Sequence, residues 1–165
     1  QLEKPEFVML DTMNHWIGSE RPALLKLLPQ VDCVCVNFEE ALQLADTTSG
    51  AKAIRRILDL GTRTLIVKRG EHGATLATRN WQFSTPSYPT DRVVDPTGAG
   101  DSFAGGTLGY LAKHGLGEAS LRKAVVYGSV MGSFAVEEFG TRRIQGVARE
   151  EVEARAKTLL DMLRI

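Results

Sequence analysis

The stretch VVDPTGAGDSFAGGTLGYLA, residues 93–112, is the most informative part of the chain. Two glycines flank Ala99 just before an apolar helix that we expect to begin near Asp101. Glycine lets the backbone turn tightly and approach a ligand closely. The free amides of Gly98–Asp101 would point outwards at the positive end of the helix dipole, and such a site binds phosphate without needing a side chain.

Asp101 itself has two interpretations at this stage. A carboxylate beside a phosphate that is being transferred can accept a proton from an attacking hydroxyl. The alternative is a helix that follows a glycine-rich turn, in which Asp101 only interacts favourably with the helix dipole. The spacing of the residues alone leaves both interpretations open.

The string DPTGAGDSFAGG, residues 95–106, resembles the C-terminal signature of the ribokinase/PfkB family of carbohydrate kinases. It is not a P-loop, because the GK[ST] ending is absent, and it is not a dinucleotide-binding GxGxxG. The resemblance implies ATP-dependent phosphoryl transfer to a hydroxyl of a small molecule. It implies that Asp101 is the base and that the amides of Gly98, Ala99 and Gly100 form the anion hole for the transferred group.

Asn37 and Glu40, in the segment VNFEEAL, match the NxxE motif of the same family. The resemblance implies that they help to hold Mg²⁺ and the phosphates, with Glu40 binding the metal through water. An Asn at a helix start with a Glu three residues later also forms a capping box. The two interpretations are compatible.

The segment KRGEHGA, Lys68–Ala74, resembles the part of the family that follows a sheet strand and approaches the ATP phosphates. Lys68 would add a positive charge there, and Gly70 and Gly73 would allow close approach. The alternative is a tight turn between strands with a solvated lysine.

Asp95 and Thr97 occupy positions that bind a monovalent cation such as K⁺ in some relatives. Their alternative is a turn in which the Asp side chain accepts a backbone hydrogen bond and the Thr hydroxyl makes another. Tyr127 and Gly128 would lie near the adenine if the helix after the signature runs as it does in relatives. A position in the core is the alternative for Tyr127.

Apolar runs and turn residues around these motifs predict alternating strands and helices. The expected strands are 7–11, 31–37, 64–68, 74–79 and 81–88, and the expected helices are 21–28, 39–45, 50–60, 101–114, 118–138 and 149–163. This order predicts a three-layer α/β/α ribokinase-like fold with a largely parallel sheet. Ligands of such sheets bind beyond the carboxyl ends of the strands, where the motifs above fall.

The composition is that of a soluble globular protein, and its 165 residues lie within the ordinary range of one domain. Twenty basic residues balance twenty acidic ones, so we expect no nucleic acid partner and no membrane surface. No apolar run approaches the ~18 residues that a membrane span needs. Cys33 and Cys35 have no partner cluster, which favours buried, reduced thiols and a cytoplasmic location.

The resemblance covers only the second half of the family's pattern, since no Gly-Gly substrate segment and no lid sheet are visible. We therefore expect a single α/β unit, residues 1–165, that corresponds to the C-terminal half of a kinase and is inactive alone. The expected partners are ATP and a small-molecule alcohol, first a sugar and alternatively a nucleoside, with a homo-oligomer as a further expectation. The alternative class is a non-catalytic fragment that binds nucleotide or assembles with another chain.

Overall fold

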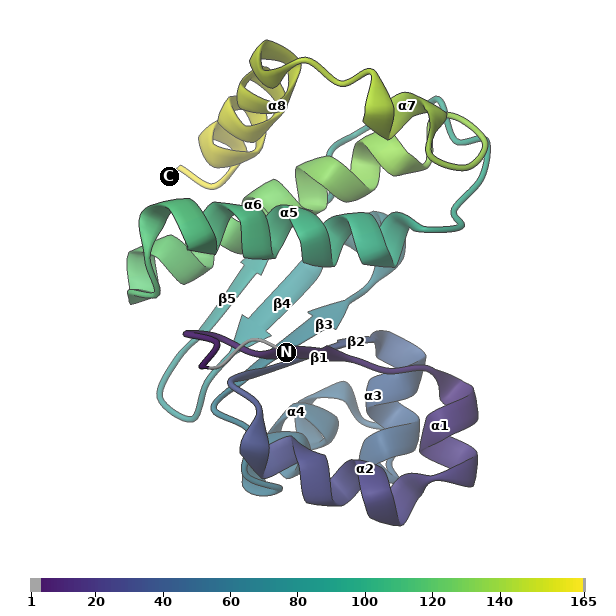
Figure 1. Ribbon diagram of the computed structural model, residues 1–165, viewed down its shortest axis with the longest axis vertical. Helices are drawn as coiled ribbons and strands as arrows, with labels where there is room; N and C mark the ends of the chain where they lie inside the picture. Colours follow the sequence, from purple (N-terminus) through teal and green to yellow (C-terminus); the bar gives the residue numbers. More distant parts are fainter. Residues whose placement is uncertain (1–3, 165) are drawn as a thin grey trace. The chain divides into compact units, whose positions relative to one another are not determined.

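The structure, a computed structural model, describes residues 4–164 (Figure 1). These residues form two compact units. One contains the chain up to Arg69 together with Thr75–Phe83, and the other contains Gly70–Ala74 together with the chain from Ser84 onwards. The expectation of a single α/β unit stays a prediction.

The first unit contains most of the sheet and four helices. Its elements are β1 (Met9–Asp11), α1 (Asn14–Ser19), α2 (Arg21–Leu27), the 3₁₀ turn η1 (Leu28–Gln30), β2 (Cys33–Asn37), α3 (Phe38–Ala45), α4 (Gly50–Asp59), β3 (Thr64–Lys68), β4 (Ala74–Ala77) and the start of β5 (Gln82–Thr85). Each expected strand and helix of this region is present, with ends that differ by a few residues. The short helix α1 was not predicted, because its six residues have neither a capping side chain nor an acidic first turn.

The five strands lie in the order β1-β2-β3-β4-β5. β1, β2 and β3 pair in parallel, and the register places Asp11 opposite Cys35 and Asn37 opposite Lys68. Short links join β3 to β4 and β4 to β5, whereas a parallel pair needs a crossover of a dozen or more residues. The sheet is therefore mixed, with its parallel part at β1–β3.

The interior of the first unit forms on one face of the parallel strands. Val34 and Val36 of β2 are fully buried in a hydrophobic cluster with Leu44 of α3 and Ile57 of α4. Figure 1 shows α1–α4 on this side of β1–β3. Alternate residues of a strand point to opposite faces, so β2 is apolar on both sides because both of its faces are covered.

Cys33 and Cys35 alternate with these valines and therefore lie on the opposite face of β2. Both are buried and neither is in a disulfide. Burial raises the pKa of Cys35 to about 12 and raises the pKa of Cys33 as well. Thiols with such pKa values stay protonated at neutral pH, and the prediction of buried, reduced cysteines is confirmed.

The second unit is mainly helical. Its elements are η2 (Gly70–His72), the end of β5, α5 (Ala99–His114), α6 (Glu118–Ala135), α7 (Arg142–Gln145) and α8 (Arg149–Met162). α5 runs along α6, and α8 packs on α6 (Figure 1). The expected helix 118–138 is shorter in the structure and ends at Ala135, and the short helix α7 after it was not predicted.

Small residues allow α5 and α6 to pack closely. A Cβ atom added to Gly128 would lie 2.3 Å from the Thr107 hydroxyl and 2.8 Å from the Phe103 carbonyl oxygen. One added to Gly106 would lie 2.6 Å from the Met131 side chain. These glycines therefore allow α5 and α6 to pack at a distance that any larger residue would increase.

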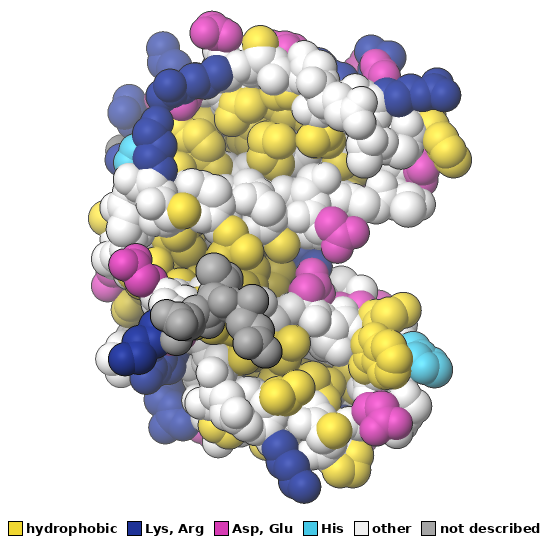
Figure 2. All heavy atoms as spheres, viewed as in Figure 1, with side chains coloured by type: hydrophobic (Ala, Val, Ile, Leu, Met, Phe, Trp, Pro, Cys, Tyr) yellow, Lys and Arg dark blue, Asp and Glu magenta, His cyan; other side chains and the backbone are white. Residues whose placement is uncertain are grey.

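No helix within residues 4–164 combines the length and the apolar character that crossing a membrane requires. Basic and acidic side chains are both scattered over the face of the molecule in Figure 2, in keeping with the equal numbers of the two charges.

We expect Gly128→Ala to destabilise the protein by about 1–3 kcal/mol, because the new methyl group has no room between the two helices. Gly109→Ala on α5 is the matched control, since a Cβ atom there meets nothing within 4 Å. Alanine favours a helix over glycine by about 0.5–1 kcal/mol, so the control should raise the melting temperature. A thermal melt of both variants checks this. Equal shifts for the two would contradict the tight contact.

Candidate active site

The glycine-rich turn leads directly into α5. Gly98 precedes the helix in the left-handed conformation, with φ of 79°, which glycine adopts without strain. The Ser102 amide donates to the Gly98 carbonyl at 2.9 Å, which closes the first turn. The Ala99 amide donates to the Pro96 carbonyl at 3.2 Å, whereas within residues 4–164 no backbone acceptor takes the Gly100 or Asp101 amide. The amides of Gly100 and Asp101, with that of Gly98 just before the helix, are therefore the donors that remain at this helix start.

Asp101 is the third residue of α5, and its side chain is exposed. The helix was expected to begin near Asp101 and begins two residues earlier, at Ala99. The carboxylate therefore lies within the first helical turn beside the free amides. This arrangement combines donors for an anion with an acceptor for a proton.

Asp95 organises the turn that precedes α5. Its Oδ1 atom accepts the Thr97 amide at 3.0 Å. Hydrogen bonds from Thr97, and a further one from the Gly140 amide, hold the pKa of the Asp95 carboxyl below its usual range. The turn interpretation of Asp95 and Thr97 is confirmed, and cation binding at these residues stays a prediction.

Asn37 and Glu40 form a complete capping box at the start of α3. The Glu40 amide donates to Asn37 Oδ1 at 2.8 Å, and the Asn37 amide donates to Glu40 Oε2 at 2.8 Å. Glu40 is buried although it carries a carboxylate. The capping interpretation is confirmed. The metal interpretation stays a prediction, and the Oε1 atom of Glu40, which takes no part in the cap, is open to it.

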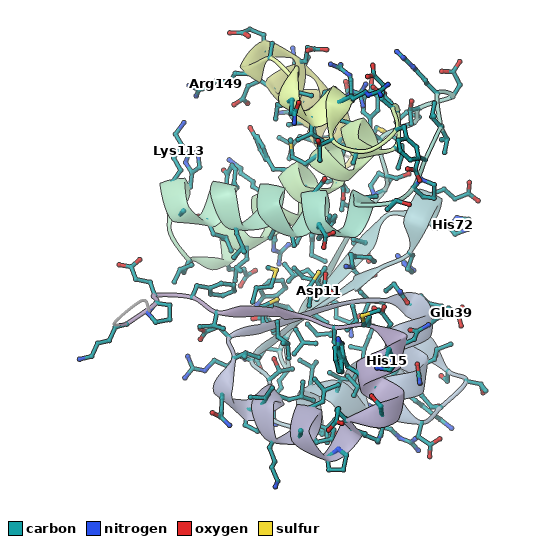
Figure 3. The ribbon with its side chains drawn as sticks, turned by 45° about the vertical axis from the view of Figure 1, so that its right-hand side comes forward. Asp11, His15, Glu39, His72, Lys113 and Arg149 are labelled. Carbon is teal, nitrogen blue, oxygen red and sulfur yellow. The ribbon has the colours of Figure 1, made fainter. Side chains whose placement is uncertain are left out.

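Lys68 is held by a neighbouring strand. Its Nζ atom lies 2.7 Å from Oδ2 of Asp11, at the end of β1 (Figure 3), and only 16% of the lysine side chain is exposed. Burial lowers the pKa of Lys68, but the hydrogen bond and the charge of the Asp11 carboxylate outweigh it, so the pKa is raised. The alternative of a solvated lysine is therefore wrong, and the charge of Lys68 is already neutralised by a partner.

The sequence places Asp11 at the end of the first expected strand but does not indicate its partner. A signal was available, because Asp11 and Lys68 each end a parallel strand, and such ends meet at one edge of the sheet. The pairing itself depends on β1 and β3 lying on either side of β2, which no local pattern reveals.

Gly70 and Gly73 both have positive φ, of 56° and 85°. A Cβ atom on Gly73 would lie 2.0 Å from the Thr85 carbonyl oxygen. Glycine is required at Gly73 because the segment passes this close to the backbone after β5. The contact of these glycines with phosphates stays a prediction.

Tyr127 and Gly128 lie on α6. The Tyr127 hydroxyl donates to Glu153 Oε2 at 2.5 Å, and its ring lies 4.6 Å from the ring of Tyr110. Burial, with the nearby Glu153 carboxylate, raises the pKa of Tyr127. Tyr127 therefore links α6 to α8, and Gly128 allows α6 to approach α5. A role near adenine stays a prediction for both.

The family profile described as pfkB family carbohydrate kinase matches residues 4–145. This range covers the glycine-rich turn, the start of α5 and the capping box of α3. The chain belongs to the pfkB family of carbohydrate kinases.

Two curated relatives illustrate the range of the family. The aminoimidazole riboside kinase of Salmonella typhimurium is 34% identical over 123 residues, which are 73% of this chain and 38% of that protein. The deoxyribokinase of Salmonella typhi is 33% identical over 130 residues, which are 73% of this chain and 41% of that protein. The chain thus spans about two fifths of the length of these relatives.

The crystal structure of aminoimidazole riboside kinase from Salmonella enterica, complexed with aminoimidazole riboside and an ATP analogue, is similar in fold. The TM-score is 0.80 at 27% identity, and the match covers 91% of this chain and 52% of that one. The predicted ribokinase-like α/β fold is confirmed.

We expect Asp11→Asn to destabilise the protein by about 1–3 kcal/mol, because it leaves the mostly buried Lys68 ammonium without its charged partner. Arg63→Gln is the control, since it breaks the pair with Asp32, in which 82% of the arginine side chain is exposed. An exposed pair contributes about 0–1 kcal/mol. Urea denaturation of both variants measures the difference, and equal losses would show that the Asp11–Lys68 pair contributes no more than a surface pair.

Proposed function

We propose that this chain carries the phosphoryl-transfer site of an ATP-dependent kinase that acts on a hydroxyl of a small molecule. The observation that carries the proposal is the start of α5, where the left-handed Gly98 is followed by free amides and Asp101 in one turn. Membership of the pfkB family supports it. Residues 95–106 further support the proposal that the chain corresponds to the C-terminal half of such a kinase.

In the proposed reaction, the oxygen of the substrate hydroxyl attacks the γ-phosphorus of ATP. The Asp101 carboxylate accepts the proton of that hydroxyl. A new phosphorus–oxygen bond forms, the bond to the bridging oxygen breaks, and ADP leaves. Charge spreads over the oxygens of the transferred group, and amides that point at it stabilise that charge. Gly98 and Gly100 supply such amides, and the Ala99 amide joins them if it exchanges the Pro96 carbonyl for the phosphoryl oxygen.

Glu40 fits a role in holding Mg²⁺ through water. Mg²⁺ keeps several waters and uses one or two carboxylates together with substrate phosphates. The cap occupies Oε2 of Glu40 and leaves Oε1 for a metal-bound water. Bound Mg²⁺ would neutralise phosphate charge. Asn37 fixes the Glu40 backbone and so orients this carboxylate.

The remaining predicted contacts are part of the same proposal. The Asp95 carboxylate, whose pKa is lowered, supplies negative charge for a cation such as K⁺, with Thr97 as its neighbour in the turn. Gly70 and Gly73 give backbone near the phosphates, with Lys68 at the preceding strand end. Tyr127 and Gly128 are proposed near the adenine.

A sugar is the first candidate substrate and a nucleoside the second. The deoxyribokinase and the aminoimidazole riboside kinase are 33% and 34% identical to this chain, so identity does not separate the two classes. A non-catalytic role in binding nucleotide remains the competing class. The aspartate in the GAGD turn favours catalysis, because binding alone does not require a base.

We expect Asp101→Asn in the full-length protein to lower turnover by about 10²–10⁴-fold, because the amide keeps the shape but cannot accept the proton. ATP affinity and melting temperature should change little. Asp161→Asn, the same chemical change on an exposed face of α8, is the control. Turnover and nucleotide binding are measured together. A variant that keeps a tenth of the activity would exclude Asp101 as the base.

We expect Glu40→Gln to raise the Mg²⁺ concentration for half-maximal activity severalfold, because it removes a carboxylate that orients hydrated metal. Glutamine also serves a capping box, so the melting temperature should stay nearly unchanged. Glu39→Gln is the matched control, since Glu39 is exposed in the same helical turn. The measurement is a Mg²⁺ titration at fixed ATP beside a thermal melt. An unshifted titration would leave Glu40 as a helix cap only.

A further inference from the structure

A polar cavity of about 500 Å³ lies in the second unit, next to the segment that leads into the glycine-rich turn. Its lining comes from residues 88–92, from Glu137 and Glu138 after α6, and from Arg143 and Arg155. The side chains of Arg143 and Arg155 are mostly shielded from solvent, and that of Glu137 is only 6% exposed. A buried carboxylate is retained only when its charge is paired, so its partners indicate what it does.

Glu137 joins three separate segments. Its Oε1 atom accepts from Arg155 of α8 at 2.5 Å and from the Thr90 hydroxyl at 3.2 Å. Its Oε2 atom accepts from Nε of Arg143 at 3.2 Å. Burial alone would raise the pKa of Glu137, but the hydrogen bonds from the two arginines outweigh it and the pKa is lowered. The carboxylate is thus the common acceptor for α7, α8 and the segment before the turn.

The arginines are fixed in turn by aromatic rings. The guanidinium carbon of Arg155 lies 3.7 Å from the centre of the Phe134 ring and 4.4 Å from that of Tyr88. Arg155 also donates to the Ser133 hydroxyl at 2.9 Å. A guanidinium held between rings loses little further freedom when it binds a carboxylate. Glu137 therefore occupies one defined position.

The backbone on either side of Glu137 holds the glycine-rich turn. The Val136 carbonyl accepts the amides of Val94 at 2.8 Å and of Asp95 at 3.2 Å. The Asp95 carboxylate, whose pKa the Gly140 backbone helps to lower, accepts the Thr97 amide at 3.0 Å. An unbroken set of bonds thus runs from the segment that contains Glu137 to the turn that begins α5.

We propose that Glu137 is a positioning residue for phosphoryl transfer. Glu137 anchors the segment Val136–Gly140, and this segment holds the turn before Asp101 in place. The inference rests on the proposed function. In this proposal Glu137 acts through the segment that it anchors and not by contact with the substrate. Since phosphoryl transfer depends chiefly on positioning and on oriented donors, movement of the turn lowers the rate of the chemical step.

The test compares Glu137→Gln with Glu138→Gln, which removes the same charge from the adjacent residue. Glu138 pairs with Arg92 at 3.4 Å, and 62% of that arginine side chain is exposed. We expect Glu137→Gln to lower kcat by about ten- to a hundredfold with little change in KM for ATP. Glu138→Gln should leave both constants unchanged. Glu137→Asp, which keeps the charge, should restore part of kcat, whereas a loss of packing alone would not be restored.

Amide hydrogen exchange gives a readout that does not depend on activity. Residues 93–101 should exchange faster in Glu137→Gln than in the wild type or in Glu138→Gln. Thr90→Val removes one bond to Glu137 without unpairing a buried charge, so it should fold and show a smaller increase in the same residues. This variant keeps the test decisive if Glu137→Gln does not fold.

Unchanged exchange at residues 93–101 in these variants would overturn the anchoring, whatever the activity. Faster exchange with unchanged kcat would overturn the effect on catalysis. If the wild-type protein transferred no phosphate from ATP to any sugar or nucleoside, the proposed function would fail. The exchange comparison would still decide whether Glu137 holds the turn.

Discussion

The backbone at the start of α5 imposes the constraint on which the second unit depends. An α-helix leaves its first amides without partners, and the proposed phosphoryl transfer requires that those amides stay available and in a fixed place. Gly98 turns the chain into the helix in a conformation that other residues rarely adopt, and the bonds of Asp95 hold the preceding turn. The Val136 carbonyl then ties this turn to the end of α6. In the proposed site, affinity for an anion would come from backbone geometry, with Asp101 as the single acidic side chain of the first turn.

The first unit meets a related constraint with charged side chains. Its parallel strands end in polar residues at one edge, and two of the carboxylates there have partners. Asp11 pairs with Lys68 across the sheet, and Glu40 closes the capping box with Asn37. Burial makes an unpaired charge costly, so these groups are satisfied before any ligand is considered. A ligand that uses Lys68 would have to compete with Asp11 or bind beside an existing ion pair.

Local patterns predicted most of the elements and the clearest part of the site. The strand Thr64–Lys68 and the capping box of Asn37 and Glu40 depend on residues within a few positions of each other, which a sequence displays directly. The predicted helix to Glu138 was too long, because the chain leaves α6 at Ala135 to direct Val136 and Glu137 towards other segments. The solvated Lys68 was wrong for a similar reason, since its partner lies 57 positions away.

By itself, the sequence determined the ribokinase-like class, the glycine turn before Asp101 and the buried, reduced state of Cys33 and Cys35. These features follow from short-range sterics, from apolar runs and from residue types that only a few conformations tolerate. Only the tertiary structure decided that Asp11 neutralises Lys68 and that Glu137 gathers Arg143, Arg155 and Thr90. The physical reason is that an ion pair depends on distance in space, and residues far apart in the chain carry no local mark of the partner that folding brings to them.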